Sequence, residues 1–272
     1  MSTVHETALH GRVALITGAA GGQGRAHAVR LAEAGADLIL TDLGSTDVQG
    51  ERLAETARLA RARGARVVAR PADVRTPAAV GDLADRGVAE LGRLDVVVAN
   101  AGVIRTGSTL ETSQDDWHLT LDVNLTGTWN TCRAALPHLI HGGRGGSIIV
   151  IGSIHSLRAS GTAVAYTASK HGLLGLAKAL AMEFAPYSIR VNSVHPTTVL
   201  TDMLRGLSPQ VSPDELAEHY LGFNALPVPW VEPNDVSSLV AFLASDEARY
   251  ITGAAVPVDA GTLLLGPSAS GS

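Results

Sequence analysis

The sequence predicts one α/β domain with a doubly wound parallel sheet, and three observations lead to this prediction. Short apolar runs rich in β-branched residues alternate with helical patterns along the chain. These runs are continuously apolar, as strands covered by helices on both faces require. A glycine-rich turn separates the first strand from the first helix. Such alternation implies right-handed crossovers between parallel strands.

The expected elements follow one another without a repeat or a low-complexity linker, so residues 1–272 are expected to form a single domain with a large core. Strands are expected at Val13–Thr17, Asp37–Thr41, Arg66–Ala69, Asp95–Ala99, Ser147–Ile151, Ile189–Val194 and Ala255–Val258. Helices are expected at Gly24–Ala34, Gly50–Arg63, Pro77–Leu91, Trp117–Leu139, Ala165–Phe184 and Asn234–Ala244.

Composition narrows the possible partners and the location. A formal charge of −5 and a pI near 6.0 argue against a nucleic-acid surface, which needs clustered Lys and Arg. Cys132 is the only cysteine, so no internal disulfide is possible and a reducing compartment is expected. The segment Met1–Arg12 lacks the apolar core of a signal peptide, and the longest apolar runs are strand-sized. We therefore expect a soluble cytoplasmic protein without a membrane partner.

The turn after the first strand has the features of a dinucleotide site. Gly18, Gly22 and Gly24 lie between the strand and a helical pattern, in the spacing G-x-x-x-G-x-G. Glycines there let the backbone turn tightly and approach a pyrophosphate, whose negative charge lies at the helix N-terminus. A tight turn without a ligand is the alternative, and the flanking strand and helix argue against it.

Residues at the ends of the next three strands extend this site. Asp42 ends the second strand, where a carboxylate binds the adenosine ribose hydroxyls and repels a 2′-phosphate. Asp42, with Leu43 beside it, therefore favours NAD over NADP. A simple turn aspartate is the alternative, and Arg25 is a cation that could compensate a phosphate. Further cofactor-binding candidates follow the third and fourth strands, where they can bracket an adenine or allow close approach: Asp73, Val74, Asn100, Ala101 and Gly102.

The segment Tyr166–Lys170 indicates the chemistry. A free phenol has a pKa of about 10 and is a poor base at neutral pH, and a nearby cation lowers that value. Residues four apart share one face of a helix, so the ammonium of Lys170 is expected beside the ring of Tyr166. Lys170 and Lys178 are the only lysines in the chain. Taken alone the pair is a weak signal, because an amphipathic helix can carry both residues by chance.

The chain resembles the classical branch of the short-chain dehydrogenase/reductase family in the order and spacing of these motifs: Thr17-Gly18-x-x-x-Gly22-x-Gly24, Asn100-Ala-Gly102, Asn124, Ser153 and Tyr166-x-x-x-Lys170. The resemblance extends from Arg12 to about Gly261. It implies a Rossmann-like fold with a seven-stranded parallel sheet, and usually a homotetramer. It also implies hydride transfer between a nicotinamide and an alcohol or carbonyl.

The resemblance assigns catalytic roles to four residues. Tyr166 would be the general acid/base, and Lys170 would hold the nicotinamide ribose and lower the pKa of the tyrosine. Ser153 would hydrogen-bond the substrate oxygen, and Asn124 would support a water that links Lys170 to solvent. A placed proton-transfer group typically contributes 10²–10⁴-fold to the rate.

The resemblance also implies that a strand-end segment holds the nicotinamide carboxamide through Pro196, Val199 and Thr201. Two residues depart from the family pattern. Gln23, itself a cofactor-binding candidate, replaces an apolar residue between two glycines. Thr197 replaces a glycine, which leaves the backbone path open because threonine does not adopt positive φ cheaply.

Within that family, three stretches resemble the carveol-dehydrogenase-like group: Gly22–Asp37, Ser193–Thr198 and Ala244–Tyr250. Many members of that group are coupled to the redox peptide mycofactocin and carry an insertion after the second strand that buries NAD. The stretch Leu43–Gly50 is short here, so ordinary NAD exchange is expected.

Residues 201–232 break the alternation and, by the resemblance, form a helical lid over the substrate. The apolar Met203, Tyr220 and Trp230 within it predict a hydrophobic secondary alcohol or ketone, with simple surface packing as the alternative. No metal is expected, because His138 and His141 lack the further ligands of a zinc site. We expect His195 to bond backbone at a strand end and Cys132 to be a core residue.

Two other functions remain open. An NADPH-dependent 3-oxoacyl reductase is possible, although Asp42 argues against it. A catalytically silent NAD-binding regulator is the other, although Ser153, Tyr166 and Lys170 are all present.

Overall fold

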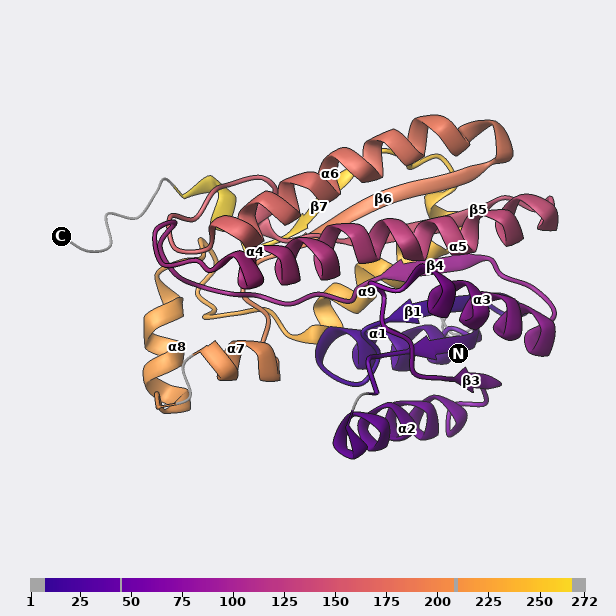
Figure 1. Ribbon diagram of the computed structural model, residues 1–272, viewed down its shortest axis with the longest axis horizontal. Helices are drawn as coiled ribbons and strands as arrows, with labels where there is room; N and C mark the ends of the chain where they lie inside the picture. The colour runs from indigo at the N-terminus through magenta and orange to yellow at the C-terminus, as the bar shows by residue number, and fades with distance from the viewer. Residues whose placement is uncertain (1–7, 45, 208–209, 266–272) are drawn as a thin grey trace.

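A computed structural model of the chain describes residues 8–44, 46–207 and 210–265 (Figure 1). Most of the N-terminal segment considered above, Met1–Arg12, lies outside the described residues. The described part contains a seven-stranded sheet whose neighbouring strands all pair in parallel. Helices lie on both faces of the sheet, so the predicted fold class is confirmed.

The strand order explains where a ligand can bind. The strands are β1 (Val13–Thr17), β2 (Asp37–Thr41), β3 (Val67–Ala69), β4 (Val96–Ala99), β5 (Gly146–Ile151), β6 (Ile189–Pro196) and β7 (Ala255–Val258). They lie in the order β3-β2-β1-β4-β5-β6-β7. Because the chain builds outward from β1 in one direction and then from β4 in the other, the carboxyl ends of β1 and β4 flank a topological switch point. Open α/β sheets bind their ligands at such a point.

Nine α-helices are described. They are α1 (Gly22–Glu33), α2 (Asp47–Arg61), α3 (Pro77–Leu91), α4 (Gln114–Leu121), α5 (Gly127–Gly142), α6 (Val164–Phe184), α7 (Asp202–Leu207), α8 (Pro213–Leu221) and α9 (Pro233–Ala244). Single 3₁₀ turns occur at Ile154–Ser156, Ala185–Tyr187, Asp246–Ala248 and Thr262–Leu264. Among the described helices, none combines the length and apolar character that crossing a membrane requires.

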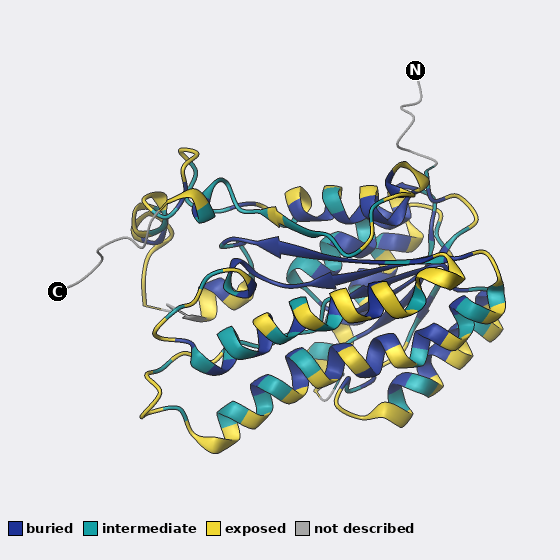
Figure 2. Cartoon of the chain, turned by 90° about the horizontal axis from the view of Figure 1, so that it is seen from above, coloured by how far each residue is buried: buried dark blue, intermediate teal, exposed yellow. Residues whose placement is uncertain are grey.

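Alternate side chains of each central strand enter two different cores. In β1, Ala14 and Ile16 pack under α1, α2 and α9, whereas Val13 and Leu15 pack under α3, α5 and α6. Figure 2 shows the buried strands between helices whose outer faces are exposed. Burial on both faces explains why the strands read as continuous apolar runs. Cys132 of α5 is fully buried in the second core, as expected.

The prediction of a single long helix at Trp117–Leu139 was wrong in one respect. α4 ends at Leu121, residues Asp122–Thr126 form a π-helical segment, and α5 begins at Gly127. π-helical turns carry an extra residue and occur frequently at functional sites. Here the segment contains Asn124, whose side chain is fully buried and bonds the loop after β4.

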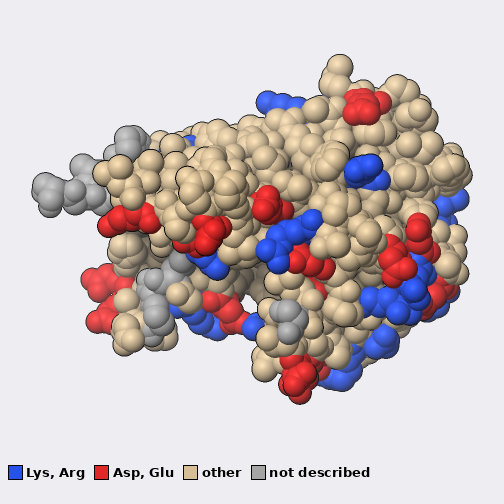
Figure 3. Space-filling model, in the orientation of Figure 1, with Lys and Arg blue, Asp and Glu red and all other residues tan. Residues whose placement is uncertain are grey.

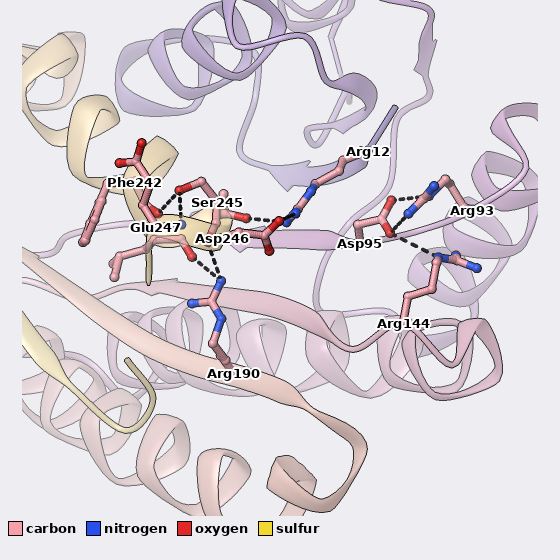
Figure 4. A network of polar contacts seen from close by, with 11 residues as sticks. Arg12, Arg93, Asp95, Arg144, Arg190, Phe242, Ser245, Asp246 and Glu247 are labelled. Carbon is pink, nitrogen blue, oxygen red and sulfur yellow. Dashed lines mark hydrogen bonds and ion pairs between the residues drawn. The ribbon is translucent and has the colours of Figure 1, made fainter. Parts of the chain in front are cut away.

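Charged residues fasten the amino-terminal ends of the strands (Figure 4). Buried Asp95 accepts the backbone N–H of Val13 at 2.9 Å and pairs with Arg93 at 2.6 Å. Arg12 pairs with Asp246 after α9 at 2.5 Å. These contacts join the start of β1 to the start of β4 and to the turn after α9, at the end of the sheet opposite the switch point.

A buried neutral histidine joins α1 to α9. His27 Nδ1 donates to Ser237 Oγ at 2.8 Å, and that hydroxyl donates to the carbonyl of Pro233 at 2.9 Å. No hydrogen-bond partner of His27 Nε2 is found in the described part of the chain. Burial lowers the pKa of His27 to about 3, whereas a histidine in an unfolded chain titrates near 6.5.

Folding stability should therefore fall as the pH drops below about 6.5, because down to about pH 3 the unfolded chain binds a proton at His27 that the folded chain does not. Between pH 7 and pH 5 this costs roughly 2 kcal/mol. In His27→Leu, the free energy of unfolding should fall by roughly 2 kcal/mol less than in the wild type between pH 7 and pH 5. Urea unfolding at fixed protein concentration measures this difference. His118→Leu, on an exposed face of α4, is the control. Undiminished acid sensitivity in His27→Leu would show that another group is responsible.

Candidate active site

A cavity of about 440 Å³ opens at the switch point, within the size range of small-molecule sites. Figure 3 shows a hollow in this face of the molecule, with basic and acidic side chains on its rim. The cavity brings together most of the predicted cofactor-binding and catalytic residues: Gly18, Gly22, Gln23, Gly24, Asp42, Leu43, Asp73, Val74, Asn100, Ala101, Gly102, Tyr166, Lys170 and Thr201. Four other predicted residues are not part of its lining: Asn124, Ser153, Pro196 and Val199.

Hydrogen bonds fasten the end of β1 to the end of β4 beneath this cavity. Thr17 Oγ1 accepts the backbone N–H groups of Asn100 and Ala101, each at 3.1 Å. Asn100 Nδ2 donates to the carbonyls of Thr17 at 3.0 Å and Gly18 at 3.2 Å. A Cβ at Gly24 would lie 2.0 Å from the Gly18 carbonyl oxygen, so only glycine fits there.

The start of α1 fits the pyrophosphate of a dinucleotide. Its N-cap residue, Gly21, offers no side-chain hydrogen bond, and the first turn contains no acidic residue. The first backbone N–H groups of the helix are therefore left for an anion. Gln23 lines the cavity, and its buried Oε1 finds no hydrogen-bond partner within the described structure.

The carboxylate of Asp42 is held in place by backbone. Its Oδ2 accepts the N–H of Ala20 and its Oδ1 accepts the N–H of Leu43, each at 2.8 Å. Arg25 donates to the carbonyls of Ala20 at 2.7 Å and Arg52 at 3.1 Å. Arg25 is thereby committed to backbone, and it is not among the cavity-lining residues.

The expected adenine end of the cavity contains a cation that the sequence did not mark. Arg75 donates from Nε to Asp73 Oδ1 at 3.0 Å and from Nη2 to Asp73 Oδ2 at 2.6 Å, and these hydrogen bonds hold the pKa of Asp73 below its ordinary value. The carbonyl of Val74 accepts a hydrogen bond from Asn130 Nδ2 at 2.9 Å. Sequence reasoning missed Asn130 because it lies 56 residues away, in α5.

Lys170 and Tyr166 lie side by side on α6, as their spacing predicted. Lys170 Nζ lies 5.4 Å from the centre of the Tyr166 ring and donates to the carbonyl of Ile151 at 2.9 Å. Burial lowers the pKa of Lys170 to about 8. Burial also raises the pKa of Tyr166, and a side-chain hydrogen bond with Ser153 opposes this rise. The expected net lowering of the tyrosine pKa is therefore wrong for this arrangement, because desolvation outweighs the favourable contacts.

Ser153 is positioned by the turn that follows β5. It caps the 3₁₀ turn Ile154–Ser156, and its carbonyl accepts a hydrogen bond from His195 Nδ1 at 3.0 Å. This contact confirms that His195 bonds backbone, and burial lowers its pKa to about 4. The ring of His155 meets that of Tyr166 edge-on, with centroids 5.7 Å apart.

Asn124 supports the loop that carries Gly102. Its Oδ1 accepts the N–H of Val103 at 2.8 Å, and its Nδ2 donates to the Val103 carbonyl at 2.9 Å and to Ser169 Oγ at 3.0 Å. A Cβ at Gly102 would lie 3.3 Å from Asn124 Oδ1 and 3.8 Å from Lys170 Nζ. The water expected beside Asn124 remains a prediction.

The threonine that replaces the family's glycine at position 197 has a structural role. Its hydroxyl lies 2.9 Å from the Thr262 hydroxyl and 3.3 Å from Asn224 Oδ1. Thr197 is not among the described residues with positive φ, so the backbone there does not need glycine. The side chain instead ties the end of β6 to the expected lid and to the C-terminal turn.

The expected lid at 201–232 contains α7 and α8, and residues 208–209 between them lie outside the described residues. Some of the apolar residues of this segment are buried by packing, and one of them lines the cavity. Leu204 and Leu216 are buried, and the rings of Tyr220 and Phe223 pack at a tilt with their centroids 5.6 Å apart. Met203 lines the cavity.

His138 and His141, at which the sequence predicted no metal site, lie on α5. His138 pairs with Asp85 at 2.9 Å, and His141 bonds the carbonyl of Pro137 at 2.6 Å. Among the described residues, no group of three or more His, Cys, Asp or Glu side chains is arranged to hold a metal ion.

Comparisons with known proteins agree with this geometry. The family profile described as enoyl-(acyl carrier protein) reductase matches residues 18–262. A short-chain type dehydrogenase/reductase of Mycolicibacterium smegmatis is 48% identical over 94% of this chain and 98% of its own length. The (-)-trans-carveol dehydrogenase of Rhodococcus erythropolis is 45% identical over 94% and 99%.

A crystal structure gives the same picture. Carveol dehydrogenase from Mycobacterium avium in complex with NAD matches with a TM-score of 0.90 and 44% identity, covering 95% of this chain and 100% of that one. With a family profile over most of the chain and relatives above 40% identity over nearly full length, the chain belongs to the short-chain dehydrogenase/reductase family of oxidoreductases.

Proposed function

We propose that this protein is an NAD-dependent oxidoreductase that interconverts a hydrophobic secondary alcohol and its ketone. The observation that carries the proposal is one cavity lined by both the Tyr166–Lys170 pair and the carboxylate of Asp42. The first could serve proton transfer and the second could hold an adenosine ribose. The NAD complex of the similar carveol dehydrogenase supports the choice of cofactor.

Proton transfer is assigned to Tyr166. When bound, NAD would supply the acceptor for the hydride of the alcohol carbon, and its reduced form would supply the hydride donor for a ketone. During oxidation the Tyr166 oxygen takes the proton of the alcohol, and during reduction its hydroxyl gives a proton to the ketone oxygen. Ser153, hydrogen-bonded to Tyr166, would hold the same substrate oxygen. The ammonium of Lys170 stabilises negative charge on the phenolate.

Electrostatics favour NAD over NADP. Asp42 is fixed at the cavity by two backbone N–H groups, so it cannot turn away from a ribose 2′-phosphate without losing both. Arg25, the cation that could compensate such a phosphate, is bonded to backbone carbonyls. This arrangement also argues against an NADPH-dependent 3-oxoacyl reductase.

The substrate is proposed to be apolar and cyclic. The cavity lining includes the apolar side chains of Val103, Leu119, Val123 and Met203. Such a lining suits a hydrocarbon skeleton that carries one secondary hydroxyl. The carveol dehydrogenase activity named for two similar proteins supports the same class.

We also propose a homotetramer in the cytoplasm, as the family resemblance implies. Large apolar side chains on the outer surface support an assembly, because Met182 is 81% exposed and Tyr250 is 89% exposed. The single cysteine, buried as a free thiol, is consistent with a reducing compartment.

Tyr166→Phe should remove the proton-transfer group and leave the cofactor contacts. Turnover of secondary alcohols with NAD, followed by nicotinamide absorbance, should fall about 10²–10⁴-fold. Affinity for NAD should change less than about twofold, because the contacts that bind the cofactor before the reaction are retained. Tyr187→Phe, on an exposed turn, is the matched control. Wild-type turnover in Tyr166→Phe would contradict the assignment, and a silent wild type that binds NAD would favour the regulator.

Asp42→Ala should relax the cofactor preference. Removing the carboxylate loses ribose hydrogen bonds and the repulsion of a 2′-phosphate, so the NAD:NADP ratio of kcat/KM should drop about tenfold or more. Asp82→Ala, on the exposed face of α3, controls for net charge. An unchanged ratio would contradict the ribose assignment of Asp42.

A further inference from the structure

One ion pair joins the two walls of the cavity. Arg52 of α2 pairs with Asp202, the first residue of α7, and the two are 150 positions apart in the chain. Both side chains line the cavity, and both are partly exposed to solvent. The pair therefore connects the helix after the expected ribose site to the helix that begins the expected lid.

The guanidinium of Arg52 lies over the glycine-rich loop. A Cβ built on Gly21 would come within 2.8 Å of Arg52 Nη2, so the guanidinium rests against that backbone. A Cβ built on Gly22 would meet Thr201 at 3.2 Å, next to Asp202. Arg52 and the start of α7 thus approach the start of α1 from two sides, where the N–H groups are left for an anion.

The charges around Arg52 favour a change of its partner when an anion binds. Exposed ion pairs contribute little, whereas a guanidinium binds phosphate through strong, directional hydrogen bonds. Asp202 would keep a cation nearby after losing Arg52, because Arg205 Nη1 lies 3.7 Å from its Oδ1. Arg25 cannot take the same role while its guanidinium holds the carbonyls of Ala20 and Arg52.

We propose that Arg52 is a pyrophosphate-binding residue for which Asp202 competes, so that nucleotide binding exchanges the Arg52–Asp202 pair for an Arg52–pyrophosphate contact. The inference rests on the proposed function, since it takes the dinucleotide as the ligand. It adds a residue outside the glycine motif to the cofactor site. It also couples nucleotide binding to α7, because the exchange releases the start of that helix from α2.

The test compares two probes, ADP-ribose, which contains the pyrophosphate, and adenosine, which does not. Arg52→Gln should weaken ADP-ribose binding about tenfold, the loss expected for one charge-assisted hydrogen-bonded contact. The dissociation constant for adenosine, measured by NMR titration, should change less than about twofold. Arg58→Gln, one to two turns further along α2 and paired with Glu55, is the matched control and should leave both constants unchanged.

Asp202→Asn tests the competition. It should tighten ADP-ribose binding severalfold, because the free protein no longer holds Arg52, and leave adenosine binding unchanged. Three outcomes would overturn this inference alone. Arg52→Gln could lose the same affinity for ADP-ribose as for adenosine, or lose no affinity for ADP-ribose. Asp202→Asn could bind ADP-ribose more weakly than the wild type. A wild-type protein that binds neither ADP-ribose nor NAD would overturn the proposed function with it.

Discussion

Keeping the ammonium of Lys170 inside the fold is the constraint on which the rest of the candidate site depends. Moving a charged amine out of water is costly, and this cost is what lowers the pKa of Lys170 to about 8. Its Nζ donates a hydrogen bond to the carbonyl of Ile151, the last residue of β5. That contact ties the centre of α6 to the strand end from which Ser153 follows.

The same constraint explains the close packing around the strand ends. A Cβ at Gly152 would lie 2.5 Å from His195 Nδ1, which itself holds the carbonyl of Ser153. Gly102 likewise leaves space for Asn124 on one side and Lys170 on the other. The His195 imidazole beside Gly152 is neutral at pH 7, because burial lowers its pKa to about 4, so it adds no second charge near the amine.

Much of this arrangement could be predicted from the sequence. The continuous apolar run of β1 and the glycines after it indicated a buried parallel strand leading into a nucleotide site, and the four-residue spacing placed Lys170 beside Tyr166. Local patterns failed where distant residues decide the outcome. The π-helical segment depends on Asn124 reaching Val103, and the threonine at 197 depends on Asn224 and Thr262. The sign of the tyrosine pKa shift depends on burial, which no spacing reveals.

The buried amine can be measured directly because the chain has only two lysines, Lys170 and Lys178. With ¹³C-labelled lysine, an NMR titration would follow Lys170 in the folded protein against exposed Lys178 as an internal reference. The account predicts that Lys170 titrates at about 8, and that Lys170→Met identifies its signal. A Lys170 signal that titrates near the ordinary lysine value of about 10.4 would contradict a desolvated ammonium beside Tyr166.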